Sequence, residues 1–154
     1  MTPPPIGDSF PKELKEEFSN RNLKAGCVIK CFVNDTNPPK EKRFIVMGVS
    51  YDKIALGTVY INTHINPNVF PTEELKQLHI PLESDNRDYL DHDSFVDCSK
   101  LYEKKLSEIK LIIEADVDSY LGELSPEDYK IIRDKIKISK NISVHVKKKF
   151  GLFL

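Results

Sequence analysis

The sequence has no apolar run that approaches the roughly 20 residues a helix needs to cross a bilayer. Its first residues, Met1 to Pro5, carry neither the basic cluster nor the apolar stretch that is typical of a signal peptide. Both absences predict a cytoplasmic protein that has no membrane partner.

An excess of positive charge is also missing. The formal net charge is −1, so the composition is not that of a general basic nucleic-acid binder. The charges are unevenly spread, however: residues 24–53 carry six Lys or Arg against three Asp or Glu, whereas residues 71–104 carry four against nine. An anion site would therefore be local, and its expected cations are Lys40, Lys42 and Arg43.

Cysteine is scarce, with three residues in the chain. Cys27 and Cys31 fall on one face of a strand at a separation of roughly 13 Å, which is too far for an easy disulfide. Cys98 stands alone, and a zinc site would need tighter pairs and further ligands. The three cysteines are therefore interpreted as buried, reduced thiols.

Four residues in a short stretch, Asp91, His92, Asp93 and Asp97, resemble a metal site at first sight. Adjacent residues of an extended chain point to opposite faces, so these side chains do not readily converge on one ion. The favoured interpretation is a solvated loop that leads into a strand. We expect no metal and no other cofactor.

Runs of β-branched and aromatic residues predict most of the strands. The expected strands cover residues 27–33, 43–50, 56–63, 79–82, 94–99 and 108–114, and a short link at 51–53 joins the second to the third. Pro81 confines its strand to a sheet edge, because proline cannot donate a hydrogen bond to a neighbouring strand.

Two helices have clear start signals. Thr72 caps a short helix that follows it, and Ser125 caps a longer one that has Pro126 in its first turn and apolar residues at helical spacing as far as Ile136. Short strands followed by a terminal helix indicate a mainly β, α+β fold, either a small β-barrel or a strongly bent sheet with helices packed on it.

At 154 residues the chain is long enough for one domain with its own core. Three successive prolines predict a disordered start over residues 1–8, and Ser9 with Pro11 opens an N-terminal helix. The expected units are this tail and helix over 1–24, a barrel domain over 25–140 with an insertion around 67–93, and a basic, solvated tail over 141–154.

The strongest functional signal is a cation and a hydroxyl at the same end of two paired strands. Arg43 enters one strand and Thr63 ends the next, so pairing through the 51–53 link brings them together. A guanidinium forks onto anionic oxygens, which indicates a phosphate or phosphodiester site. His64 could supply acid–base chemistry if the chain bends after the strand, because neighbouring side chains on a regular strand point to opposite faces.

The order of several short motifs resembles the MazF/PemK/Kid family of bacterial growth-inhibiting toxins, whose fold is an SH3-like barrel with a C-terminal helix. The motifs are a glycine-led strand from Gly26, an arginine-led strand from Arg43 to Ser50, a glycine-led strand from Gly57 to Thr63, the string Asp93-Ser94-Phe95-Val96, and Gly122-Glu123-Leu124-Ser125-Pro126-Glu127-Asp128 leading into the last helix. The similarity covers roughly residues 26–138, and the order of the motifs carries it, because each motif alone is a common string.

The resemblance implies an endoribonuclease that cuts single-stranded RNA, forms a homodimer and is neutralised by an antitoxin protein. It carries active-site roles to Arg43 and Thr63. Cleavage needs no metal if the 2′-hydroxyl of the RNA attacks the adjacent phosphorus, and His64 or Asp97 would then move the protons. The strand would pass aromatic side chains and the basic residues Lys40 and Lys42.

The sequence also departs from the family. Phe44 follows the arginine where members often have proline, and Asp97-Cys98-Ser99 stands where some members have an Arg-x-Asp pair. The stretch from residue 67 to 93 is longer than usual and acidic, and the N-terminal helix is extra. Two interpretations therefore remain open: a divergent toxin, or a non-catalytic barrel of the same fold that binds a protein partner or nucleic acid.

Overall fold

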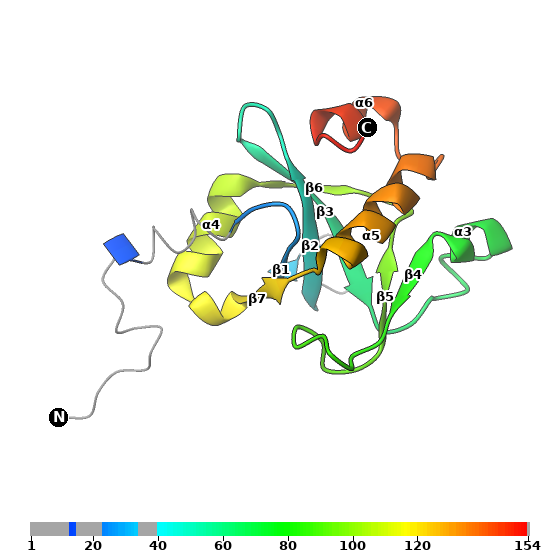
Figure 1. The fold of residues 1–154 in the computed structure, drawn as a ribbon, viewed down its shortest axis with the longest axis horizontal. Helices are drawn as coiled ribbons and strands as arrows, with labels where there is room; N and C mark the ends of the chain where they lie inside the picture. Colours follow the sequence, from blue (N-terminus) through cyan, green and yellow to red (C-terminus); the bar gives the residue numbers. More distant parts are fainter. Residues whose placement is uncertain (1–12, 15–22, 34–39, 154) are drawn as a thin grey trace.

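The structure, a computed structural model, describes residues 13–14, 23–33 and 40–153. Within these residues seven antiparallel strands form one curled sheet in the order β4-β5-β3-β2-β1-β7, with β6 pairing beside β5 along β3 (Figure 1). The strands are β1 Cys27–Val33, β2 Lys40–Val49, β3 Ala55–Asn62, β4 His79–Leu82, β5 Ser94–Asp97, β6 Tyr102–Lys105 and β7 Tyr120–Glu123. The helices are α3 Glu73–Gln77, α4 Leu106–Ala115, α5 Pro126–Ile138 and α6 Val144–Lys149, with a 3-10 turn, η1, at Val117–Ser119.

The β2–β3 hairpin is the centre of the sheet. Its strands pair with Arg43 opposite Ile61, near the end that lies away from the turn. In the turn, the Asp52 carboxylate accepts hydrogen bonds from the Ser50 hydroxyl at 2.6 Å and from the Ile54 amide at 3.1 Å. The predicted short link is confirmed, so Arg43 and the end of β3 meet at the opposite end of the hairpin.

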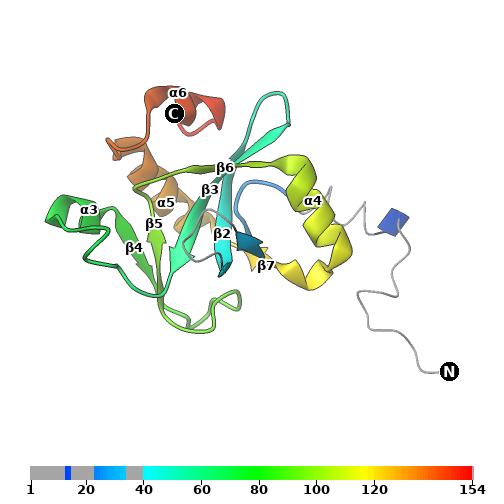
Figure 2. The ribbon, with the colours of Figure 1, turned by 180° about the vertical axis from the view of Figure 1, so that it is seen from behind.

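The hairpin is buried on both faces because a different helix packs against each face. Successive strand residues point to opposite faces, and both sets are apolar here. One core contains Ile45, Val59 and Ile61 with Ile132 and Ile136 of α5, and the other contains Phe44, Val46 and Tyr60 with Ile109 and Ile113 of α4. Figure 1 shows α5 crossing the near side of the sheet, and Figure 2 shows the strands from behind, in front of α5.

The architecture confirms the predicted α+β class of a curled sheet with helices packed on it. The first three strands and the edge strand are found within a few residues of their predicted bounds. Both predicted caps are present: the Thr72 hydroxyl accepts a hydrogen bond from the Leu75 amide at 3.2 Å, and the Ser125 hydroxyl accepts one from the Asp128 amide at 3.1 Å.

The prediction of a strand over residues 108–114 is wrong, because this segment forms most of α4. Its apolar, β-branched residues favoured a strand. In the structure, however, Ile109 and Ile113, four residues apart, are buried, whereas Leu111 between them is 64% exposed. A buried stripe with helical spacing, packed on the α4 face of the sheet, decides the conformation against local strand preference.

The C-terminal segment differs from the expected solvated tail. Phe150 and Leu152 are buried in the core that contains α5. The ammonium group of Lys147 is also buried, and it donates hydrogen bonds to the carbonyl oxygens of Lys137 and Ser139 at 2.8 and 2.9 Å. The last carbonyl groups of a helix lack hydrogen-bond partners within the helix, and the Lys147 ammonium group donates to them here. Polar as well as apolar contacts therefore attach α6 to α5.

Two glycines of the central hairpin make room for this segment. Gly48 and Gly57 pair across β2 and β3. A Cβ atom at Gly48 would lie 2.1 Å from the carbonyl oxygen of Phe150, and one at Gly57 would lie 2.7 Å from the Phe150 ring. The absence of side chains at both positions therefore allows Phe150 to pack directly against the hairpin backbone.

The predicted state of the cysteines is confirmed, because Cys27, Cys31 and Cys98 are all buried and none forms a disulfide. Burial raises the pKa of the Cys27 and Cys98 thiols to about 12. Both groups are therefore neutral thiols at physiological pH and behave as small core side chains.

The predicted disordered start, over residues 1–8, and most of the predicted N-terminal helix lie outside the described residues. In the part of the chain that the structure describes, no helix combines the length and the apolar character needed to span a bilayer.

We expect Phe150→Ala to lower the free energy of unfolding by about 3–5 kcal/mol, because it leaves a cavity beside Gly48 and Gly57. The matched control is Phe153→Ala, which removes a side chain that is 48% exposed and lies near Lys148, and it should cost less than about 1 kcal/mol. Urea denaturation measures both. If the two variants were equally stable, the C-terminal segment would not be part of the core.

Candidate functional site

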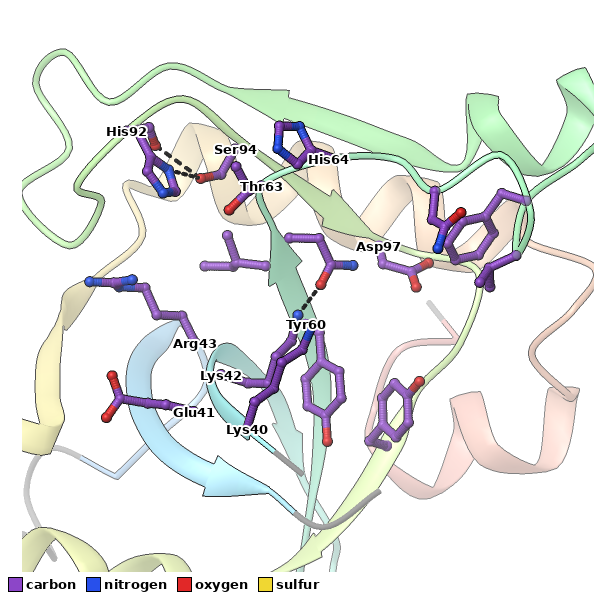
Figure 3. A pocket seen from close by; sticks show the side chains of 16 residues that line it. Lys40, Glu41, Lys42, Arg43, Tyr60, Thr63, His64, His92, Ser94 and Asp97 are labelled. Carbon is purple, nitrogen blue, oxygen red and sulfur yellow. Dashed lines mark hydrogen bonds between the residues drawn. The ribbon is translucent and has the colours of Figure 1, made fainter. Parts of the chain in front are cut away.

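A pocket of about 670 Å³ lies at the end of the β2–β3 hairpin that is opposite its turn (Figure 3). All six residues singled out from the sequence line it: Lys40, Lys42, Arg43, Thr63, His64 and Asp97. Further lining residues include Glu41, Tyr60, Asn62, Phe70, His92, Ser94 and Tyr102. The pocket therefore draws on β2, β3, β5 and β6, on the segment between β3 and α3, and on the loop before β5.

The register of the sheet divides these residues between two sides of β3. Arg43 pairs with Ile61 and Ile61 pairs with Val96, so Arg43 and Ser94 belong to the face of the sheet that carries α5. Lys42, Asn62, Tyr60, Asp97 and Tyr102 belong to the opposite face by the same count. We call the first set, together with His92 and Thr63, the arginine side and the second set the tyrosine side. Figure 3 shows Arg43 and Asp97 on either side of the strand.

Arg43 is the most distinctive group of the arginine side. Its Nη2 donates a hydrogen bond to Oδ2 of Asp91 at 2.6 Å, and this carboxylate is 74% exposed. Its Nε is buried and has no hydrogen-bond partner among the described residues. Burying a hydrogen-bond donor without a partner lowers the stability of the fold. Nε and Nη2 together form the edge of the guanidinium that can donate to two oxygens of one anion.

The loop that carries Asp91 is anchored at several points. Nε and Nη2 of Arg87 donate hydrogen bonds to the two carboxylate oxygens of Asp128 in α5 at 2.9 and 3.0 Å, and these bonds raise the pKa of Arg87. Within the loop, Asp93 accepts hydrogen bonds from the amide and hydroxyl of Ser84, which lower the pKa of Asp93. The loop is therefore held against α5, and this brings Asp91 to Arg43.

Hydroxyl and imidazole groups surround the open part of the arginine side. The buried hydroxyl of Ser94 donates a hydrogen bond to the carbonyl oxygen of His92 at 2.9 Å, and it lies 3.4 Å from Nδ1 of the same histidine. Thr63 and His64 are exposed and follow the last residue of β3, where the chain bends. The bend allows both residues to line the pocket, although neighbouring residues on a regular strand could not.

Asp97 has a different environment. It is 5% exposed, and its Oδ1 accepts hydrogen bonds from the amide of Ser99 at 2.9 Å and from the hydroxyl of Ser99 at 2.5 Å. His79, its cross-strand neighbour, is also buried and has Nε2 3.6 Å from the same oxygen. Asp97 is thus held in the wall of the pocket, on the side of β3 away from Arg43.

The pocket holds three cations, and three carboxylates accompany them when Asp91, which contacts Arg43, is counted. The cationic side chains of Lys40, Lys42 and Arg43 line it, against the carboxylates of Glu41 and Asp97. Lys42 donates a hydrogen bond to the side-chain oxygen of Asn62, its cross-strand neighbour, which orients its ammonium group within the pocket (Figure 3).

Three residues that the structure places at Arg43 or around it, Asp91, His92 and Ser94, are not predicted from the sequence as part of an anion site. In the sequence, His92 and Asp91 resemble only metal ligands, and Ser94 is only part of a family motif. Their positions depend on how the loop before β5 returns to the hairpin, which no local pattern encodes. Among the described residues, no group of three His, Cys, Asp or Glu side chains is arranged to hold a metal ion.

Comparison of the sequence with protein-family models and with characterised proteins finds no match. The chemistry of the site and the order of motifs in the sequence are therefore the indications of function.

We expect Asp91→Asn to strengthen the binding of inorganic phosphate by up to about fivefold, because the exposed carboxylate that competes for Arg43 is neutralised. Asp88→Asn makes the same charge change at another exposed position of this loop and serves as the control. Both affinities are measured by NMR titration at one ionic strength. Equal effects of the two substitutions would mean that net charge, and not the Arg43 contact, controls binding.

Proposed function

We propose that this protein is a metal-independent endoribonuclease that cleaves single-stranded RNA, and that it acts as the toxin of a toxin–antitoxin pair. The observation that carries the proposal is the guanidinium of Arg43, which has one unpartnered buried nitrogen and one nitrogen on an exposed carboxylate. The SH3-like barrel, the homodimer and the antitoxin partner belong to the same proposal and depend on the resemblance to the MazF/PemK/Kid family.

Arg43 would hold the phosphate whose bond is cut. Phosphate oxygens would replace the Asp91 carboxylate at Nη2 and give Nε the acceptor it lacks. As the 2′-hydroxyl attacks, negative charge grows on those oxygens, and a fixed guanidinium stabilises the transition state more than the ground state. Thr63 would orient the phosphate through its hydroxyl.

Cleavage through the 2′-hydroxyl needs one proton removed and one proton donated. The attacking oxygen loses its proton to a base as it bonds to phosphorus, and the departing 5′-oxygen takes a proton from an acid, leaving a 2′,3′-cyclic phosphate. Imidazole is the side chain that most often does both at neutral pH. His92, on the arginine side, and His64, at the bend after β3, are better situated for this than Asp97, which lies across β3.

A second candidate function is binding of nucleic acid without cleavage. The contact between Arg43 and Asp91 favours it, because an arginine already engaged by a carboxylate is less available to a transition state. The chain would then retain the anion-binding pocket of a nuclease without its chemistry.

The deciding experiment is incubation of the purified protein with a long single-stranded RNA in excess EDTA, followed by mapping of the fragment ends. We expect discrete cuts that leave cyclic phosphates. Arg43→Ala should slow cutting by about 10²–10³-fold, the typical effect of losing one electrostatic stabiliser. The control Tyr51→Ala changes a fully exposed residue in the turn at the far end of the hairpin and should cut normally. If a folded Arg43→Ala protein cut RNA as fast as the unaltered protein, the proposal would be wrong.

We expect His92→Ala to slow cutting by about 10²–10⁴-fold and to remove one limb of the pH–rate profile, as loss of a general acid or base does. Asp97→Asn should lower the stability of the fold, because the Asp97 carboxylate accepts two hydrogen bonds from Ser99. The protein that remains folded should keep both limbs of the pH–rate profile. Thermal unfolding monitored by circular dichroism separates the two effects. A lost limb in Asp97→Asn, with His92→Ala unaffected, would transfer the proton role to Asp97.

A further inference from the structure

The tyrosine side of the pocket contains a pair of stacked aromatic rings. The rings of Tyr60 and Tyr102 lie 4.1 Å apart between centroids and are inclined by 13°. Tyr60 is 3% exposed, whereas Tyr102 is partly exposed, and both line the pocket. Tyr60 therefore fixes the orientation of Tyr102, and the pocket has access to part of the Tyr102 ring.

Lysines surround this aromatic pair. The ammonium group of Lys100 lies 4.8 Å from the centroid of the Tyr102 ring. Lys104 donates a hydrogen bond to the Tyr60 hydroxyl at 3.0 Å, and Lys42 lies 5.6 Å from the centroid of the Tyr60 ring. Aromatic rings interleaved with cations are the combination that binds single-stranded nucleic acid, because bases stack on the rings while phosphates contact the ammonium groups.

We propose that Tyr102 is a stacking platform for a nucleobase of single-stranded RNA, with Lys100 and Lys104 contacting the phosphates on either side of that base. The proposal rests on the proposed function, and it adds a base-binding subsite apart from the scissile phosphate. Lys100 is exposed and has a long, flexible side chain, so it can leave the ring for a phosphate when the base arrives.

The position of this subsite determines which part of the RNA it binds. Tyr102 pairs with Thr58 on β3, and Arg43 pairs with Ile61 on the same strand, from the other side. Strand spacing places the two residues roughly 14 Å apart. The base on Tyr102 and the phosphate on Arg43 therefore belong to different nucleotides of one strand. Bases inside a duplex are already stacked and paired, so the subsite selects unpaired RNA.

The test is binding of a fluorescein-labelled single-stranded oligonucleotide with 2′-O-methyl groups, which cannot be cut because the attacking hydroxyl is blocked. Tyr102→Leu should weaken binding by about 5- to 150-fold, the usual effect of removing one stacking ring. Tyr51→Leu, at the exposed turn of the hairpin, is the matched control and should bind as the unaltered protein does. A backbone of the same length without bases should bind the unaltered protein and Tyr102→Leu equally.

Two further variants keep the test informative if Tyr102→Leu does not fold. The chain has no tryptophan, so Tyr102→Trp introduces a single indole that should retain affinity and lose fluorescence when a base stacks on it. Lys100→Gln should reduce the slope of log affinity against log salt by about 0.7, the value for one phosphate contact on a single strand. Lys140→Gln, an exposed lysine just after α5, should leave the slope unchanged.

Unchanged affinity in a folded Tyr102→Leu protein, an indole that the oligonucleotide does not quench, or no oligonucleotide binding at all would each overturn the proposed subsite. These results are distinct from failure of the nuclease proposal. That failure appears as intact unmodified RNA in the cleavage assay, and it can occur while binding still depends on Tyr102.

Discussion

Burial of the β2–β3 hairpin on both faces is the constraint on which the rest of the structure depends. Apolar side chains alternate without a polar face, so each face of the pair needs its own cover. α5 and the C-terminal segment cover one face and α4 covers the other. The charged side chains of the two strands, Lys40 to Arg43, lie at the end of the hairpin away from its turn. The pocket therefore forms at this end, from the residues where the two strands leave the core.

The same constraint gives the pocket two chemically different sides. Because strand residues alternate, Arg43 emerges from the core shared with α5, whereas Lys42 and Tyr60 emerge from the core shared with α4. A single strand of RNA that passes around the end of β3 could contact both, with a phosphate at the guanidinium and a base at the stacked tyrosines. A cation on one side and an aromatic platform on the other would together bind a longer segment of RNA than either alone.

The contact between Arg43 and Asp91 connects the acidic segment around 67–93 with this chemistry. The segment is anchored to α5 through Arg87 and Asp128, and it brings a carboxylate to a guanidinium that still has an unpartnered Nε. Such a pair is weak because Asp91 is largely exposed, so an incoming phosphate can replace it at small cost. This segment thus supplies a competitor for the anion site and, through His92, a candidate proton carrier.

Local chemistry in the sequence determined the first strands, the turn at 51–53, the capped helices and the meeting of Arg43 with Thr63, because each depends on alternation, capping or one short connection. The tertiary structure alone decided that the apolar stretch 108–114 is a helix, since the shape of the sheet face selects Ile109 and Ile113 for burial. It also decided that the C-terminal segment packs on Gly48 and Gly57, and that Asp91, His92 and Tyr102 join the site. These contacts link residues that are far apart in the sequence, and no local pattern encodes them, because they depend on the volume left between elements after the sheet has curled.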